Sequence, residues 1–148
     1  MIKIIATLLT FFAFNVSHAK VNVGIILGFT GPIETLTPGM SAGAELAFNE
    51  AADSGKLLNG QGINIIKVDS TCVDSAAATS AAESLISQGV TAIMGADCSG
   101  VTGAVLSNVA VPNGVPMISP SATSPGLTTA PDNGLFFRTA PSDARGGE

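Results

Sequence analysis

Short apolar runs alternate with longer amphipathic segments along the chain, and this alternation constrains the fold more than any other feature. Five runs have the length of a strand and are rich in Val, Ile, Met or Phe: 21–27, 63–69, 92–95, 115–119 and 135–138. The spacing of apolar residues between them predicts helices over 39–54, 75–88 and 101–109. Strands that alternate with helices in this way imply a parallel sheet with helices on both faces. The sequence therefore predicts an α/β fold built on a doubly wound parallel sheet.

Glycine, proline and aspartate residues at the ends of these segments support the predicted boundaries. Asp74 is positioned to cap the second helix, because its carboxylate can accept hydrogen bonds from the free N–H groups of a helix start. Gly55 and Gly89 are expected to end the first and second helices. Pro112 and Gly114 are expected to end the third. A chain of 148 residues is long enough for one ordinary domain of about 100–200 residues.

The order of the strands decides where a ligand would bind. Right-handed crossovers leave few arrangements of such a sheet, and ligands bind outside the carboxyl ends of the strands, where the strand order reverses. In a flavodoxin-like order that crevice lies between the first and third strands. It would bring residues 29–32 next to residues 98–100. The segment 118–125, rich in Ser, Thr and Pro, includes the end of the fourth strand and reaches the same edge.

The residues expected at this edge suit a small zwitterion. Ser99 to Thr102 would occupy a helix N-terminus, where free N–H groups and the helix dipole favour a carboxylate. Gly100 would let a ligand approach the backbone, and the hydroxyls of Ser99 and Thr102 would add donors. Ser121 and Thr123 offer carbonyl and hydroxyl oxygens for an ammonium group.

Each of these residues also has an ordinary structural explanation. Serine is a common helix-capping residue, so Ser99 is alternatively a cap, and Ser121 and Thr123 are of types that are common in turns. Phe29 is expected either in the wall of the pocket or in the hydrophobic core. The convergence of these residues on one predicted edge favours a ligand site.

The N-terminal segment 1–19 is predicted to be a signal peptide and not part of the fold. Lys3 precedes a mostly apolar stretch, 4–16, and residues 17–19 show the small-x-small pattern that signal peptidases accept. A membrane anchor is the alternative, but the stretch is shorter than the ~20 residues of a spanning helix and contains Thr and Asn. We therefore expect export and a mature chain that begins at Lys20.

Export affects the interpretation of the two cysteines, Cys72 and Cys98. An oxidising compartment favours a disulfide between an even number of cysteines. Both cysteines follow predicted strands, so they should lie at the same edge of one sheet. A bridge that closes a loop of about 25 residues would stabilise the fold by about 3.5 kcal/mol. Two free, buried thiols are the alternative.

Composition argues against catalysis, metal binding and nucleic-acid binding. The one histidine, His18, falls in the predicted leader, which excludes a Ser-His-Asp triad, a Cys-His dyad and histidine-ligated metals from residues 20–148. No Gly-x-Gly-x-x-Gly or Walker A pattern occurs. Asp69, Asp74 and Asp97 are interpreted as caps and turn residues. The net charge of −5 disfavours binding to nucleic acid. From these observations together we expect a protein that is not an enzyme and has no cofactor, metal or nucleic-acid partner.

Several segments together resemble the periplasmic leucine/isoleucine/valine-binding proteins of ABC importers. They are the leader, the turn 28–32 after the first strand, the cysteine pair, and the segments 98–102 and 118–125. The resemblance extends through Asp143 and covers essentially all of the mature chain. It implies the first lobe of a type I periplasmic binding protein, which captures a branched-chain or related small amino acid in the periplasm and delivers it to a membrane permease.

The resemblance also implies roles for individual residues. Six residues form the candidate ligand site: Phe29, Ser99, Gly100, Ser121, Ala122 and Thr123. In that family the residues matching Ser99, Ser121 and Thr123 hold the carboxylate and ammonium groups of the ligand. The loop that contains Phe29 borders the pocket.

Members of that family also carry a disulfide that matches Cys72–Cys98, and they continue into a second lobe before returning to the first. We therefore expect residues 20–148 to be a truncated N-terminal lobe, with the C-terminal lobe of the same chain as its partner. The loop 33–38 differs from leucine-binding examples, and related receptors take amides, short aliphatic acids, urea or aromatic acids. The alternative function is accordingly a ligand-sensing domain of a receptor or regulator for amides or small organic acids.

Overall fold

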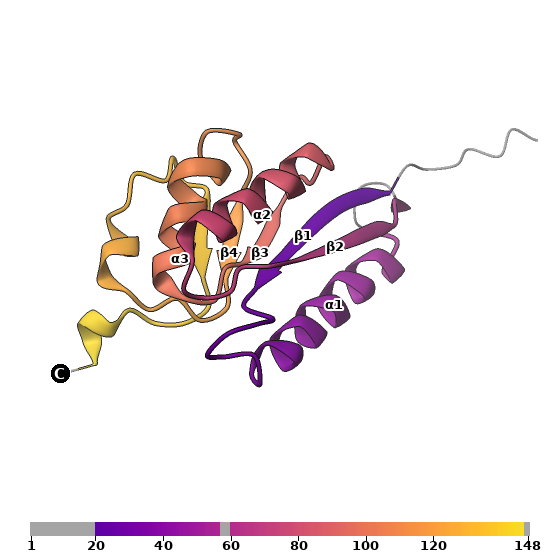
Figure 1. Cartoon of the computed structure of the whole chain (residues 1–148). Coiled ribbons are helices and arrows are strands. Elements are labelled where there is room, and N and C mark those ends of the chain that lie inside the picture. Colours follow the sequence, from indigo (N-terminus) through magenta and orange to yellow (C-terminus); the bar gives the residue numbers. More distant parts are fainter. Residues whose placement is uncertain (1–19, 57–59, 147–148) are drawn as a thin grey trace, which may run out of the picture.

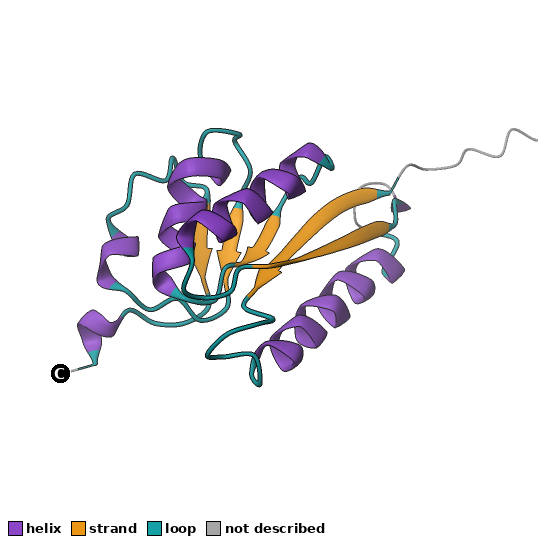
Figure 2. Cartoon of the chain, viewed as in Figure 1, coloured by secondary structure: helices purple, strands orange, loops and turns teal. Residues whose placement is uncertain are grey.

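The computed structural model describes residues 20–56 and 60–146, and its centre is a five-stranded sheet with the order β2-β1-β3-β4-β5 (Figures 1 and 2). The strands are β1 (Val21–Leu27), β2 (Ile63–Asp69), β3 (Ile93–Gly95), β4 (Met117–Ser119) and β5 (Phe136–Arg138). All neighbouring strands pair in parallel. The predicted α/β class and flavodoxin-like strand order are therefore confirmed. The predicted signal peptide, residues 1–19, lies outside the described residues.

Helices cover both faces of the sheet (Figure 1). Helix α1 (Thr37–Asp53) packs on one face, and α2 (Ser75–Ser87) and α3 (Ser99–Val105) pack on the other, which confirms the doubly wound arrangement. The remaining helical segments are the π-helical η2 (Leu106–Ala110), which continues α3, and the 3-10 turns η3 (Pro125–Thr128) and η4 (Asp143–Arg145). Over the two described ranges, no helix is both long enough and apolar enough to cross a membrane.

Local sequence explains how α2 begins and how α1 and α2 end. Asp74 is the N-cap of α2, and its carboxylate accepts hydrogen bonds from the N–H groups of Ala76 and Ala77 at 2.9 and 3.0 Å, as predicted. Gly55 and Gly89 follow the ends of α1 and α2 with φ angles of 64° and 72°. Glycine adopts this left-handed backbone without strain, so both residues end their helices as expected.

Two predicted helix starts are two residues too late. Helix α1 begins at Thr37 and not at residue 39, because Pro38 fits the first turn of a helix, where its missing N–H is not needed. The third helix begins at Ser99 and not at residue 101, because the extended backbone of Cys98 makes that residue the N-cap.

The face of the sheet under α2 and α3 holds the hydrophobic core. Leu85 of α2, Ile93 of β3 and Met117 of β4 are almost completely buried there. Leu85 lies directly against Gly24 of β1, since a Cβ added at Gly24 would be 2.6 Å from Leu85 Cδ1. The glycine therefore lets α2 approach the sheet closely.

The opposite face is covered only in part by the described residues. Lateral pairing places Ile25, Met94, Ile118 and Phe137 in one row across β1, β3, β4 and β5. Residues paired in this way point to the same face of the sheet. Ile25 is fully buried, whereas Ile118 is 42% exposed and Phe137 is 57% exposed. The apolar cover that α1 provides over β1 and β2 thus decreases towards β5.

A disulfide joins the loop after β2 to the start of α3. Cys72 and Cys98 are bonded, with their Cα atoms 5.2 Å apart. The predicted bridge is confirmed, and the alternative of two free thiols is wrong. Because Cys98 is the N-cap of α3, the bridge holds the start of that helix against the β2–α2 connection.

Replacing Cys72 and Cys98 together with serine is expected to lower the free energy of unfolding by about 3 kcal/mol, because the bridge restricts the unfolded chain. Denaturant unfolding followed by circular dichroism measures this change. Reductant should destabilise the wild-type chain by a similar amount and should leave the double variant unaffected. A wild-type midpoint that does not move on complete reduction would contradict this contribution.

Candidate functional site

The carboxyl ends of the strands meet at one edge of the sheet, and the predicted site residues follow them. Phe29 comes after β1, Ser99 after β3 and Ser121 after β4. Phe29 is half-buried and is not one of the buried core residues. Gly100 is exposed, and a Cβ added there would meet no atom within 4 Å. Open space therefore lies in front of the start of α3.

The Ser99 hydroxyl links α3 to the loop after β4. Its oxygen accepts hydrogen bonds from the N–H groups of Thr123 and Ser124, both at 3.1 Å. Ser99 is the first residue of α3, and Cys98 takes the N-cap position without a side-chain capping bond. The interpretation of Ser99 as a helix cap is therefore wrong, because its side chain binds a different loop.

The other predicted polar residues are partly or wholly engaged by the protein itself. The Thr102 hydroxyl was predicted to donate to a ligand, but it is fully buried and donates to the Cys98 carbonyl at 2.9 Å, so that prediction is wrong. The Ser121 hydroxyl donates to the Asp97 carbonyl at 2.9 Å, and the Thr123 carbonyl accepts from the Asp143 N–H at 3.0 Å. Ala122 is fully buried, so its side chain faces the protein. Among the described residues, no donor reaches the Ser121 carbonyl and no partner binds the Thr123 hydroxyl. These two oxygens are the acceptors that this loop still offers.

Arg138 of β5 holds the same loop, although it was not among the residues predicted for the site. Its guanidinium donates to the carbonyls of Ser124 and Ala122 at 2.8 and 3.4 Å, and also to the Thr128 hydroxyl. A guanidinium presents several donors in one plane, so it can hold several loop oxygens at once. In the sequence, the feature that could have indicated this role is a single cation at the end of an apolar strand.

Asp97 does more than cap a helix or a turn, which corrects its interpretation from the sequence. This residue follows β3 and is only 2% exposed. Its carboxylate accepts hydrogen bonds from the Gly28 N–H at 2.6 Å, the Cys98 N–H at 2.9 Å and the Ser70 hydroxyl at 3.2 Å. The three donors follow β1, β3 and β2. One buried side chain therefore joins the ends of three strands.

Asp69, the last residue of β2, connects the loops that follow β1 and β2. Its carboxylate accepts hydrogen bonds from the Thr30 hydroxyl, from the Thr30 N–H at 3.3 Å and from the Thr71 N–H at 2.8 Å. Partial burial acts to raise the pKa of Asp69, but hydrogen bonds from Thr30 and Thr71 outweigh it and hold the pKa below its ordinary value. Asp69 thus ends a strand and links the loops that follow β1 and β2, which corrects its interpretation from the sequence as a cap or turn residue.

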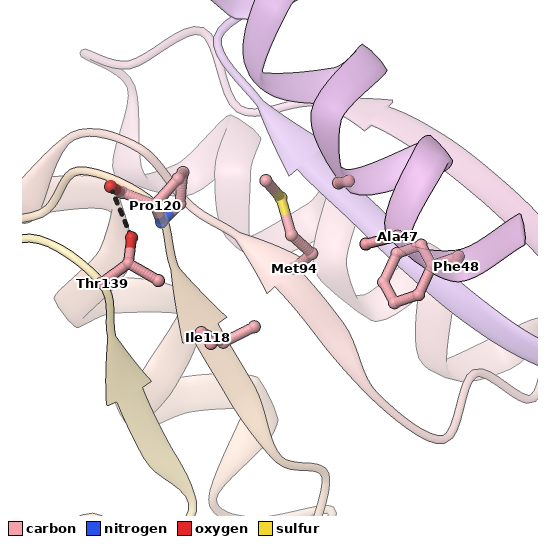
Figure 3. A pocket seen from close by; sticks show the side chains of 7 residues that line it. Ala47, Phe48, Met94, Ile118, Pro120 and Thr139 are labelled. Atoms are coloured by element: carbon pink, nitrogen blue, oxygen red, sulfur yellow. Dashed lines mark hydrogen bonds between the residues drawn. The ribbon is translucent and has the colours of Figure 1, made fainter. Parts of the chain in front are cut away.

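An apolar hollow lies on the partly covered face of the sheet (Figure 3). Its volume is about 260 Å³, and the residues that line it are Ala44, Ala47, Phe48, Met94, Ile118, Pro120 and Thr139. At one side the Thr139 hydroxyl donates to the Pro120 carbonyl at 3.0 Å. None of the six predicted ligand-site residues lines this hollow, although Pro120 directly precedes Ser121 in the chain.

Comparison with protein families matches this chain to the periplasmic binding protein family over residues 20–148. The Leu/Ile/Val-binding protein BraC3 of Rhizobium johnstonii is 32% identical over 124 residues, which cover 83% of this chain and 33% of that protein. The Leu/Ile/Val-binding protein homolog 1 of Brucella abortus is 37% identical over 131 residues, which cover 87% of this chain and 34% of that protein.

Among solved structures, a similar one is LivJ of Streptococcus pneumoniae, a branched-chain amino acid transporter substrate-binding protein in complex with isoleucine. It matches with a TM-score of 0.75 and 31% sequence identity, and the match covers 85% of this chain and 35% of LivJ. The chain thus spans about a third of the length of these relatives. Its fold is that of the corresponding part of LivJ.

Replacing Asp69 with asparagine is expected to reduce stability at neutral pH. Because the folded-state pKa lies below the ordinary value of 3.8, the carboxylate stabilises the fold above that pH and loses this contribution as the pH falls through the folded pKa. The difference in free energy of unfolding between wild type and variant should stay within about 1 kcal/mol, because water screens this group. It should shrink in acid, which denaturant titrations at neutral and acidic pH would measure.

Thr30→Val provides the control, because it removes the hydroxyl donor and leaves the carboxylate in place. In an NMR titration of the Asp69 carboxyl carbon, this variant should raise the pKa towards its ordinary value. An unchanged pKa would show that the Thr30 hydroxyl is not a cause of the shift.

Proposed function

Because this chain belongs to the periplasmic binding protein family, we propose that it captures a branched-chain or related small amino acid for an ABC importer. The names of two relatives as Leu/Ile/Val-binding proteins, and the isoleucine bound to LivJ, support this ligand class. The protein would deliver its ligand to a permease in the membrane. Its role is binding and not catalysis, in keeping with a family of substrate-binding proteins.

The observation that supports the proposal best is the hydrogen bonding of Ser99. A serine hydroxyl has two acceptor sites and one donor. The N–H groups of Thr123 and Ser124 occupy the acceptor sites, which leaves the hydroxyl hydrogen to donate. In the part of the chain that the structure describes, the N–H groups of Gly100 and Val101 also lack a protein acceptor. A ligand carboxylate would satisfy all three donors.

The ammonium group of the ligand would bind the loop after β4. The Ser121 carbonyl and the Thr123 hydroxyl are acceptors of the kind that an ammonium group needs. Ala122 would shape the loop between them, because its N–H donates to the Ser119 hydroxyl and its side chain is buried. Phe29 would border the ligand from the loop after β1.

In this proposal the mature protein lies in the periplasm, after removal of residues 1–19 as a signal peptide. Residues 20–148 would form the N-terminal lobe, and a C-terminal lobe of the same protein would close over the ligand. The greater length of the relatives supports this arrangement, since the chain matches about a third of each. The exposed position of Gly100 also suits a ligand that a second lobe encloses.

Isothermal titration calorimetry of the full chain with L-isoleucine, L-leucine and L-valine tests the function. We expect saturable binding of at least one of them. Isoleucinamide, which lacks the carboxylate, should not bind, and D-isoleucine should bind more weakly because its ammonium group is misplaced. The proposed function fails for this chain if no α-amino acid binds.

Ser99→Ala is expected to weaken amino-acid binding by roughly 1–3 kcal/mol, because the ligand carboxylate loses a hydroxyl donor. The same calorimetry measures this change. Ser107→Ala is the matched control, since Ser107 is an exposed serine in η2, and it should bind like the wild type. Equal affinities of Ser99→Ala and the wild type would show that Ser99 holds the loop at Thr123 but does not donate to the ligand.

A further inference from the structure

We propose that Asp97 is the positioning residue of the candidate ligand site, because its buried carboxylate fixes the ligand-binding loops relative to one another. The proposal rests on the proposed function above, since it concerns the same edge of the sheet. It assigns no ligand contact to Asp97. The residue acts through the backbone groups that it holds in place.

Four connections between strands and helices reach Asp97. Its side chain accepts hydrogen bonds from Gly28, Ser70 and Cys98, and its backbone carbonyl accepts one from the Ser121 hydroxyl at 2.9 Å. Gly28, Ser70 and Ser121 are 69, 27 and 24 residues away from Asp97 along the chain. One residue therefore joins the segments that follow β1, β2, β3 and β4.

Two of the candidate ligand residues are direct sequence neighbours of residues that bond to Asp97. Phe29 and Ser99 directly follow Gly28 and Cys98, the two residues whose N–H groups bind the Asp97 carboxylate. Ser99 extends the constraint, because its hydroxyl binds the loop after β4. A displacement of Asp97 would therefore change the distances between the groups that bind the carboxylate and the ammonium ends of a ligand.

The pattern of donors requires a carboxylate at this position. Oδ2 accepts from the Gly28 N–H at 2.6 Å, and Oδ1 accepts from the Cys98 N–H at 2.9 Å. An asparagine of the same shape would direct its NH₂ group at one of these N–H groups, so that two donors face each other. The fit is also close, since a Cβ added at Gly28 would lie 3.3 Å from Asp97 Oδ2 and 3.1 Å from Cys72 Cβ.

Asp97→Asn in the full chain tests the proposal, with amide-resolved NMR as the main measurement. We expect the amide signals of Thr123 and Ser124 to shift and their hydrogen exchange to accelerate by about tenfold or more, because the carboxylate that holds Cys98, and with it the neighbouring Ser99 hydroxyl, is lost. Affinity for L-isoleucine should fall by about tenfold or more. Both amides bond to Ser99 and not to Asp97, so the loss of a single local bond would leave them unchanged.

Asp132→Asn is the matched control. The Asp132 carboxylate also accepts backbone hydrogen bonds, from Gly134 at 2.9 Å and from Phe136 at 3.3 Å, but it precedes β5 and lies at the amino ends of the strands. The substitution changes a carboxylate to an amide in the same way and therefore reports the effect of general destabilisation. It should leave the amides of Thr123 and Ser124 unchanged.

Three outcomes separate this proposal from the proposed function. Amides of Thr123 and Ser124 that shift in Asp97→Asn but not in the control, together with weaker isoleucine binding, support the positioning role. The same shifts in a chain that binds no amino acid also support that role, while the proposed function fails. Amides that match the control overturn the positioning role, whatever the affinity.

Ser70→Ala keeps the test decisive if Asp97→Asn does not fold. It removes one donor from the Asp97 carboxylate and leaves both backbone donors in place. The amides of Thr123 and Ser124 should then shift in the same direction by a smaller amount. Unchanged amides in this folded variant would overturn the proposal.

Discussion

The edge that carries the candidate site depends on β1 being paired on both sides. β1 pairs with β2 over seven residue pairs and with β3 over three. The N–H and C=O groups of a buried strand need partners, and Ile25, Ile26 and Leu27 have no exposed surface. Parallel pairing then brings the carboxyl ends of the strands to one edge. Polar residues that are far apart in the sequence meet there because β1 fixes the position of both neighbours.

The elements that the sequence predicted best are those with a strong local pattern. The predicted strands 21–27 and 63–69 coincide with β1 and β2, because both are long β-branched runs between turn residues. Short strands were harder to delimit. Val115 is apolar and was expected in the fourth strand, but its N–H donates to the Ala110 carbonyl and β4 begins at Met117. The ends of a three-residue strand depend on the strands that pair with it. The local sequence carries no information about that pairing.

The candidate site likewise has features that the sequence predicted and features that it did not. The meeting of the segments after β1, β3 and β4 followed from the alternation of strands and helices and from the strand order. The partners of Ser99 and Asp97 did not, because a short polar side chain next to a helix start has a local explanation as a cap. The Ser99 hydroxyl instead bonds to N–H groups 24 and 25 residues away. Such bonds depend on the distance between loops in the folded chain, which only the three-dimensional structure gives.

The long sequence distances that Asp97 bridges affect the order in which the chain folds. A contact between residues 69 apart closes a long loop, and the entropy lost in closing it has to be offset by other contacts before the bond becomes favourable. Strands β1, β2 and β3 therefore have to assemble before the carboxylate meets its three donors. The polar edge therefore consists of long-range contacts that depend on the pairing of the central strands. Ligand capture at this edge would report that the central strands of the sheet have come together.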